Sequence, residues 1–241
     1  MPPRTVLILG GTGEGRALAA ALPRFRVISS LAGRTREPLL PAGEVRIGGF
    51  GGVDGLADYL RAQRVDVLVD ATHPFAAQIS ANAAAAAAVT GRPLLVLRRP
   101  GWIERPGDDW HRVPTLEAAA ALLPRLGRRV FLTTGRQGIA AFADTPECWF
   151  LARSVEPPTP PVPLHLEVLL DRGPFTVDGE LRLLREHRID VLVSKDSGGA
   201  DAKLVAARER GIPVVLIDRP ALPAAAATAT SVEEAVAWLH T

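Results

Sequence analysis

This chain of 241 residues contains a single cysteine, Cys148, which excludes a disulfide framework and any C-x-x-C redox or zinc motif. Lysine is equally scarce, because Lys195 and Lys203 are the only lysines among 28 basic residues. The net charge is +2 and the basic residues form no runs, which argues against nucleic-acid and membrane-surface partners. The histidines, at positions 73, 111, 165, 187 and 240, lack the spacing of a metal site. We expect no resident metal.

Long apolar segments are missing as well. The N-terminus lacks the charged and apolar regions of a secretory signal, and the alanine run at 83–88 is too short and too weakly apolar to cross a membrane. We expect a cytoplasmic protein in which the alanine run forms a packed helix. The sequence leaves the oligomeric state open, with a monomer as one alternative. The hydrophobic content of 47% and the charged content of 22% are globular values.

Short apolar runs alternate with helical patterns along the chain, beginning with residues 6–9, 27–30, 65–69 and 94–97. This alternation is typical of βαβ units and of a mainly parallel sheet. A proline-rich stretch at 157–163 is incompatible with the interior of a sheet or helix and predicts a stiff loop.

An internal repeat divides the chain. The segment Arg-Val-Asp-Val-Leu-Val at 64–69 returns as Arg-Ile-Asp-Val-Leu-Val at 188–193. Three further blocks correspond in the same order: 6–13 with 130–137, 92–100 with 211–220, and 115–118 with 231–235.

From this repeat we predict two similar Rossmann-like α/β domains with mainly parallel sheets, at residues 1–124 and 125–241. Ligands bind at the carboxyl ends of strands in such sheets, so we expect a cleft where those ends face each other. The boundary stays open, because the helix at 115–124 could pack on either sheet and a terminal helix could be exchanged across the pair.

A glycine-rich segment follows the first predicted strand directly and leads into a helical pattern: Gly10, Gly11, Thr12, Gly13, Glu14, Gly15 and Arg16. Glycines let the backbone approach a pyrophosphate, and the amino end of a helix favours its negative charge. The spacing G-x-x-G-x-G differs from the Rossmann G-x-G-x-x-G. We interpret the segment as a phosphate-binding loop, with a merely tight turn as the alternative.

The end of the second predicted strand favours NADP over NAD. An enzyme that uses NAD usually has a carboxylate there for the ribose 2′-hydroxyl. This chain instead has Ser29 and Ser30, followed by Arg34 and Arg36, which suit a 2′-phosphate. The alternative is a solvated arginine loop. The glycine cluster at 48–52 either lets the cofactor pass close to the backbone or forms a mobile turn.

The fourth predicted strand ends at Asp70, on the same sheet edge as the glycine loop. We therefore expect Thr72 and His73 to face the ribose or the nicotinamide. His73 is also a weak candidate for acid–base work.

Several segments together resemble precorrin-6A reductases, over nearly the whole chain except 101–112 and the end beyond 220. They are Gly-Gly-Thr-Gly-Glu-Gly-Arg at 10–16, Ser-Leu-Ala-Gly-Arg at 30–34, Asp-Ala-Thr-His-Pro-Phe-Ala at 70–76, Thr-Gly-Arg-Gln at 134–137 and Ser-Lys-Asp-Ser-Gly-Gly at 194–199.

The resemblance implies an NADPH-dependent reduction of precorrin-6A to precorrin-6B in cobalamin biosynthesis, with hydride passing to a carbon of the macrocycle. A related branch reduces the cobalt-loaded substrate, and no sequence feature separates the two. A non-catalytic tandem α/β sensor of NADP is a further alternative. A short-chain reductase is disfavoured, because Tyr59, the only tyrosine, has Gln63 where those enzymes have lysine.

Precorrin-6A carries many acetate and propionate groups, so its binder needs several separated cationic or N–H-donating points. We assign residues 1–124 to NADP and 125–241 to this substrate. The predicted substrate-binding residues are Thr134, Gly135, Arg136, Gln137, Arg153, Ser154, Arg172, Lys195, Ser197, Gly198 and Lys203. No catalytic residue is assigned. Asp196, His73 or solvent could supply the proton.

Overall fold

The computed structural model describes residues 3–33, 39–224 and 226–241, which form two compact α/β units. Unit 1 combines Met1–Pro100 with Pro220–Thr241, and unit 2 is Gly101–Arg219. Each unit holds one six-stranded sheet, in which every pairing between strands is parallel. The predicted α/β class with two Rossmann-like halves is confirmed.

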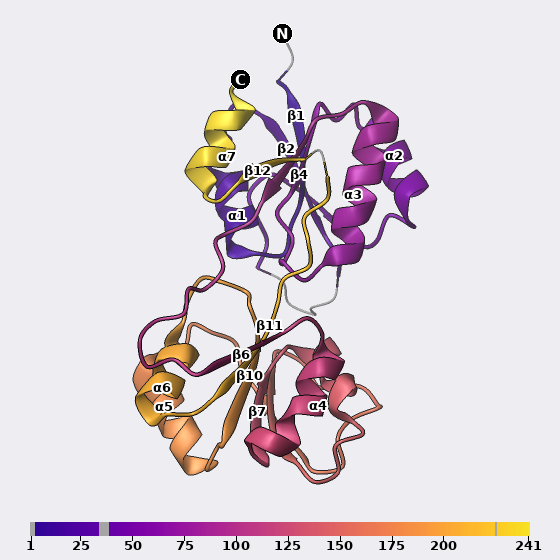
Figure 1. The fold of residues 1–241 in the computed structure, drawn as a ribbon. Coiled ribbons are helices and arrows are strands. Elements are labelled where there is room, and N and C mark those ends of the chain that lie inside the picture. Colours follow the sequence, from indigo (N-terminus) through magenta and orange to yellow (C-terminus); the bar gives the residue numbers. More distant parts are fainter. Residues whose placement is uncertain (1–2, 34–38, 225) are drawn as a thin grey trace. The chain divides into compact units, whose positions relative to one another are not determined.

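The sheet of unit 1, sheet A, has the order β12-β5-β4-β1-β2-β3. Its strands are β1 (Thr5–Leu9), β2 (Arg26–Leu31), β3 (Glu44–Ile47), β4 (Val67–Asp70), β5 (Leu94–Leu97) and β12 (Ala227–Ala229). The helices are α1 (Gly13–Ala20), α2 (Val53–Ala62), α3 (Ala77–Thr90) and α7 (Val232–Leu239). Helices α1 and α7 cover one face of sheet A, and α2 and α3 cover the other (Figure 1).

The sheet of unit 2, sheet B, has the order β6-β11-β10-β7-β8-β9. Its strands are β6 (Trp110–Val113), β7 (Arg129–Thr133), β8 (Trp149–Ser154), β9 (Leu166–Leu170), β10 (Val191–Lys195) and β11 (Val214–Ile217). The helices are α4 (Leu116–Leu126), the 3₁₀ helix η1 (Arg136–Phe142), α5 (Val177–Glu186) and α6 (Ala202–Arg210). The proline-rich stretch lies in the loop between β8 and β9.

Each sheet takes its sixth strand from the other half of the chain. Strand β6 follows β5 in sequence but pairs with β11 of sheet B, while β12 follows β11 and pairs with β5 of sheet A. The predicted boundary at 124 is therefore corrected: the chain passes into unit 2 after Pro100 and back after Arg219. The reason is that each repeat ends in a strand and a helix that join the sheet of the other repeat. Strand β6 and helix α4 complete sheet B, and strand β12 and helix α7 complete sheet A. Each completed sheet has the Rossmann order 3-2-1-4-5-6.

The repeat has a physical counterpart at the amino ends of the two central strands. The carboxylate of Asp66 accepts a hydrogen bond from the Thr5 backbone N–H at 2.7 Å, and Asp190 accepts one from the Arg129 N–H at 2.9 Å. Just before each aspartate, Arg64 and Arg188 have φ of 52° and 49°, the only positive φ values of described residues other than glycine. The same turn therefore leads into β4 and β10.

Helix starts in both units follow the sequence closely. The hydroxyl of Thr12 caps α1, that of Thr115 caps α4 and that of Ser231 caps α7, each accepting from the N–H three residues later. Helix α3 contains the alanine run and buries Ala83, Ala86 and Ala87, as expected for a packed helix. Among the described helices, none combines the length and apolar character needed to span a membrane.

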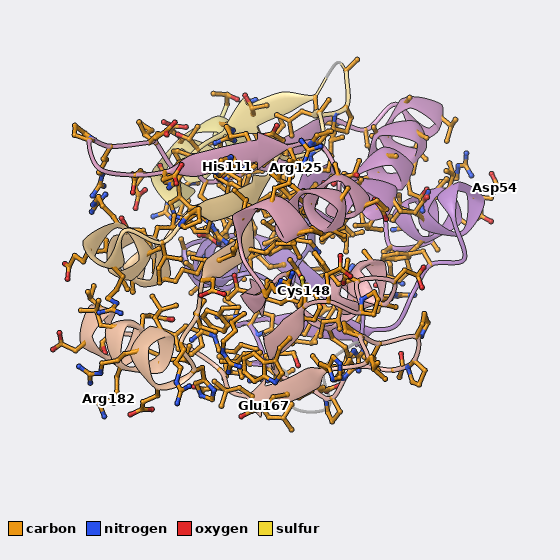
Figure 2. The ribbon with its side chains drawn as sticks, turned by 60° about the horizontal axis from the view of Figure 1, so that its bottom comes forward. Asp54, His111, Arg125, Cys148, Glu167 and Arg182 are labelled. Atoms are coloured by element: carbon orange, nitrogen blue, oxygen red, sulfur yellow. The ribbon has the colours of Figure 1, made fainter. Side chains whose placement is uncertain are left out.

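The lone thiol lies inside unit 2. Cys148 is 1% exposed and precedes β8, whereas Glu167 on β9 and Arg182 on α5 lie at the outside of the same unit (Figure 2). Burial raises the pKa of the Cys148 thiol, which therefore stays protonated and unreactive at neutral pH.

The exchanged C-terminal segment is expected to contribute strongly to the stability of unit 1. Leu239 of α7 is fully buried in the cluster that contains Leu18 and Val6. Leu239→Ala should lower the free energy of unfolding by about 2–5 kcal/mol, because it leaves a cavity between α7 and α1. Urea denaturation followed by circular dichroism measures this. The control is Ala237→Ser on the exposed face of α7. Equal midpoints for the two variants would contradict the docking of α7.

Candidate functional site

The candidate site residues of unit 1 lie at the carboxyl edge of sheet A. In the parallel register Leu9 pairs with both Ser30 of β2 and Asp70 of β4, so the segments after these three strands leave the sheet at the same edge. The chain turns from β1 to β2 on one side and reaches β4 on the other. This is the topological switch point where ligands bind in open α/β sheets.

The glycine loop after β1 is anchored to both neighbouring strands. The Gly10 N–H donates to the Ser30 carbonyl at 2.9 Å, and the Thr12 hydroxyl donates to the Ala71 carbonyl at 2.7 Å. Thr12 also accepts from the Gly15 N–H at 3.1 Å. The Thr12 hydroxyl thus holds the loop in place, and we assign it a structural role because both of these hydrogen bonds are to the protein backbone.

Two glycines of this loop are needed for different reasons. Gly11 has φ of 117°, and a Cβ built there would meet no atom within 4 Å, so its backbone faces open space. Gly15 is buried, and a Cβ there would lie 3.3 Å from the Ala71 side chain. The first glycine therefore exposes backbone at the start of α1, and the second allows α1 to pack against the end of β4.

Charged groups flank the amino end of α1. Arg99, two residues after β5, donates to both carboxylate oxygens of Glu14, at 2.9 and 2.8 Å. Burial raises the pKa of Glu14, but the hydrogen bonds from Arg99 and from the backbone, together with the charge of Arg99, outweigh this effect, so the pKa lies below its ordinary value. The Arg16 side chain forms no hydrogen bond or ion pair with any described residue, and its Nη2 lies 3.9 Å from where a Gly13 Cβ would be. A cation thus lies beside the exposed loop backbone.

The end of β2 differs partly from expectation. Ser29 is 1% exposed, and its hydroxyl has no partner among the described residues, so it lies within the core and not at the edge. The Ser30 hydroxyl accepts from Arg46 of β3 at 3.3 Å. Arg34 and Arg36, predicted to recognise a 2′-phosphate, lie outside the described residues.

Arg46 is a site residue that the sequence interpretation missed. Its guanidinium donates to the Gly48 carbonyl at 2.5 Å and to the Gly49 carbonyl at 2.6 Å, and it lies 3.8 Å from the Phe50 ring centroid. These contacts brace the glycine cluster at 48–52 against the end of β2. Arg46 pairs with Ser30 in the β2–β3 register. No sequence motif around Arg46 indicates this pairing, so the register of the strands would have been needed to predict it.

The segment after β4 forms a tight polar turn. Asp70 is 2% exposed, and its Oδ1 accepts from the Thr72 N–H at 3.0 Å and from the Thr72 hydroxyl at 2.6 Å. His73 is exposed, and its Nδ1 accepts from the Phe75 N–H at 3.3 Å. The turn orders Thr72, while His73 remains at the surface of unit 1.

A dinucleotide fits the residues at this edge. Gly11, Gly48 and Gly49 each have nothing within 4 Å of a would-be Cβ, so two backbone segments are open to close approach. The amino end of α1 and the Arg16 guanidinium supply positive charge beside the first of them. This is the donor set that a pyrophosphate requires.

The carboxyl edge of sheet B repeats the arrangement with different chemistry. Gly135, with φ of 76°, precedes the 3₁₀ helix η1 where unit 1 has an α-helix. Arg136 forms an ion pair with Glu156 at 2.7 Å, and Gln137 is exposed. Thr134 is 4% exposed, and its hydroxyl has no hydrogen bond to a described residue. The predicted cluster at 134–137 is thus assembled at one strand end.

Arg153 does not lie at the surface with the rest of the predicted substrate set. Its side chain is 7% exposed and pairs at 2.7 Å with Glu180, whose side chain is 1% exposed. The guanidinium lies 3.6 Å from the Phe175 ring centroid and 5.0 Å from that of Phe131. The neighbouring Ser154 hydroxyl donates to the Glu156 carbonyl at 2.7 Å. Arg153 therefore stabilises the interior of unit 2, because Glu180 neutralises it there.

Asp196 is also committed to structure. It is 3% exposed, and its carboxylate accepts from the Trp102 N–H at 3.0 Å and from Arg112 at 2.9 Å. Its carbonyl accepts from Arg219 at 2.6 Å. Residues at both ends of unit 2 are thereby attached to Asp196, which makes it an anchor of both segments.

The remaining predicted substrate residues lie around this anchor or at the surface. The N–H of Ser197 donates to the Lys195 carbonyl at 2.7 Å, and Gly198 follows with φ of 67°. Trp102, which was not predicted, donates from its indole to the Gly199 carbonyl at 2.9 Å, and the Lys203 ammonium lies 5.0 Å from its ring centroid. Arg172 is exposed, in the loop before α5. Among the described residues no cluster of three potential metal ligands occurs.

Comparison with known proteins gives one consistent result. The family model described as "Precorrin-6x reductase CbiJ/CobK" matches residues 5–240. The precorrin-6A reductase of Rhodococcus erythropolis is 61% identical, over 98% of this chain and 97% of that protein. The cobalt-precorrin-6A reductase of Priestia megaterium is 28% identical, over 89% of this chain and 90% of that one.

A solved structure supports the same relationship. The structure described as "CobK precorrin-6A reductase" superimposes with a TM-score of 0.92 at 47% identity, covering 98% of this chain and 96% of that chain. Agreement over both units means that the exchange of sixth strands belongs to the shared architecture.

Replacing Arg153 distinguishes an interior role from a ligand role. Arg153→Ala leaves the Glu180 carboxylate buried without its partner, so the free energy of unfolding should fall by about 3–5 kcal/mol. The measurement is urea denaturation beside a matched control, Arg182→Ala on the exposed face of α5. A variant with unchanged stability and only a raised KM for the substrate would return Arg153 to the ligand set.

Proposed function

The chain belongs to the precorrin-6x reductase CbiJ/CobK family, and on that premise we propose that it is an NADPH-dependent precorrin-6A reductase. The observation that carries the cofactor assignment is the open glycine loop of unit 1, where Gly11 presents exposed backbone at the amino end of α1. Bound there, NADPH would supply a hydride from its nicotinamide. We assign cofactor binding to unit 1 and substrate binding to unit 2.

The cofactor pyrophosphate is proposed to bind the backbone at 10–13, with Arg16 as its charged partner. Gly15 and Thr12 hold this loop against β4, and Glu14 fixes the helix start through Arg99. Ser30 and Arg46 shape the end of β2, and Arg34 is proposed to recognise the 2′-phosphate. Thr72 and His73 complete this edge.

The macrocycle is proposed to be held by its rim carboxylates at the carboxyl edge of sheet B. The proposed ligands are Thr134, Gly135, Arg136, Gln137, Ser154, Arg172, Lys195, Ser197, Gly198 and Lys203. Separated charged and N–H-donating groups suit a substrate with acetates and propionates spread around a ring. Catalysis is then proposed to depend on orientation, since no Ser-His-Asp pattern stands out in the sequence.

Metal-free precorrin-6A is the favoured substrate. The relative named for it is 61% identical to this chain, whereas the one named for the cobalt-loaded compound is 28% identical. We propose that this reaction is a step of cobalamin biosynthesis and that it takes place in the cytoplasm.

Turnover tests this function directly. Purified protein is incubated anaerobically with NADPH and metal-free precorrin-6A, while the macrocycle spectrum and NADPH absorbance are followed together. Coupled loss of both signals is the expected result. Reaction with the cobalt-loaded substrate alone would reassign the branch. NADPH binding without turnover of either substrate would favour a sensor.

Cofactor selectivity separates the roles of two arginines. Arg34→Ala should raise the Kd of NADPH about 10- to 100-fold, the effect of losing one charge-assisted hydrogen bond, with NADH little changed. Arg46→Ala removes a brace of the glycine cluster and should weaken both nucleotides alike. Isothermal titration with NADPH and NADH measures this. Equal losses for both nucleotides in the Arg34 variant would remove the 2′-phosphate assignment.

A further inference from the structure

The proposed reduction requires a proton as well as a hydride. Hydride addition forms one C–H bond and leaves an electron pair on the conjugated macrocycle, and the second C–H bond forms when that pair takes up a proton. A side chain that performs this step must carry a proton near neutral pH and reach the substrate. The inference below rests on the proposed function and concerns where that proton comes from.

The acidic candidates at the two edges are already engaged. Asp196 accepts hydrogen bonds at both carboxylate oxygens, from the Trp102 N–H and from Arg112. The Arg99 ion pair keeps the pKa of Glu14 below its ordinary value, which leaves Glu14 ionised at neutral pH. Glu156 is bound to Arg136 at 2.7 Å.

We propose that Lys195 is the general acid of this reaction and that its ammonium group protonates the macrocycle. Lys195 is the last residue of β10, at the carboxyl edge of sheet B. Leu192 belongs to the cluster beneath α5 and α6, so strand alternation places Val193 and Lys195 on the opposite face, where α4 lies (Figure 1). Ser194 pairs with Thr133, which makes Thr134 the next neighbour of Lys195 across the strands.

The residues that are buried by the elements on this face are mainly apolar. Helix α4 turns Ala119, Ala120 and Leu123 inward, and η1 turns Gly138, Ile139 and Phe142 inward. The neighbouring strand β11 contributes Ile217.

Two networks of charged residues lie near the end of β10. The ion pair of Arg136 with Glu156 lies at this edge, and Arg112 binds both Asp196 and Asp218 in a separate network that includes Arg219. The pKa of Lys195 is lowered by burial, which withdraws water from the ammonium group. The hydroxyl oxygen of Thr134, the next neighbour across the strands, is buried and has no hydrogen bond to a described residue.

Residue type supports the same role. With two lysines among 28 basic residues, this chain otherwise uses arginine, which binds carboxylates in bidentate geometry. Arginine keeps its proton at any physiological pH, whereas a buried lysine releases it readily. A lysine at this position therefore fits proton transfer better than carboxylate binding alone.

The step balances with the hydride of the proposed function. An N–H bond of the Lys195 ammonium breaks, and its electrons stay on nitrogen as a neutral amine. The electron pair on the macrocycle forms the new C–H bond. The substrate gains one hydride and one proton, and the amine recovers its proton from solvent before the next turnover.

The ionisation of Lys195 can be measured without substrate. Because the chain has two lysines, protein labelled with ¹³C at lysine Cε gives two side-chain NMR signals, which Lys203→Arg assigns. The Lys195 signal should titrate below the ordinary lysine pKa of 10.5. Titration at or above that value would overturn the proposal.

Kinetics test the proton transfer itself. Lys195→Arg keeps the positive charge but cannot release a proton, so kcat should fall at least about 100-fold while KM changes little. The wild-type kcat should fall as pH rises through the Lys195 pKa, because the acid must be protonated, and the variant should lack this decline. Unchanged NADPH affinity and Tm exclude misfolding. Arg182→Lys on the exposed face of α5 is the matched control, with unchanged kcat.

Two results contradict the donor role while leaving the reductase intact. One is a Lys195→Arg enzyme with raised KM and wild-type kcat, which makes Lys195 a carboxylate ligand only. The other is an unchanged pH profile in that variant. A wild-type protein that reduces neither form of the substrate would instead overturn the proposed function, and the donor role with it.

Discussion

The exchange of sixth strands is the constraint on which the rest of this structure depends. Strand β12 contributes three residues to sheet A. Its Ala229 carbonyl accepts a hydrogen bond at 2.9 Å from the N–H of Arg98, which lies just before the chain passes into unit 2. Strand β6 fills the same place in sheet B. Unit 1 is therefore built from two separate segments, whereas unit 2 is the continuous segment between them. Neither of the two sequence repeats, 1–124 and 125–241, contains all six strands of one sheet. Asp196 adds a local attachment, since the Trp102 N–H and the Arg219 side chain both bind it.

The two carboxyl edges show how one architecture supports different chemistry. In unit 1 the loop after β1 is small and open, with Gly11 exposing backbone and Gly15 allowing close helix packing. In unit 2 the corresponding loop has Arg136 and a short 3₁₀ helix, which present a side chain where unit 1 presents backbone. Backbone N–H groups suit a phosphate that approaches closely, while side-chain cations suit carboxylates spread over a large ring. This contrast is the physical basis for assigning the cofactor to one unit and the macrocycle to the other.

Sequence patterns predicted what depends on local chemistry. The strands, the packed alanine helix and the glycine loop follow from apolar runs, small residues and turn residues, and the structure contains each of them. The boundary was wrong because β6 and β12 are four and three residues long, and which sheet such a strand joins is decided by long-range pairing. Arg153 resembles a surface charge in sequence because its partner, Glu180, lies on a different element. Arg46 and Trp102 went unnoticed for the same reason, since their partners are brought near only by folding.

The division of labour between the two edges is the central claim, and hydrogen–deuterium exchange with NADPH alone tests it most directly. Binding of NADPH should slow amide exchange at 10–16 and 48–52 of unit 1, because these segments provide the open backbone that would meet the cofactor. Exchange at 134–137 and 194–199 of unit 2 should stay unchanged until the macrocycle is added. Protection of the unit 2 segments by NADPH alone, with the glycine loop of unit 1 unaffected, would contradict the account.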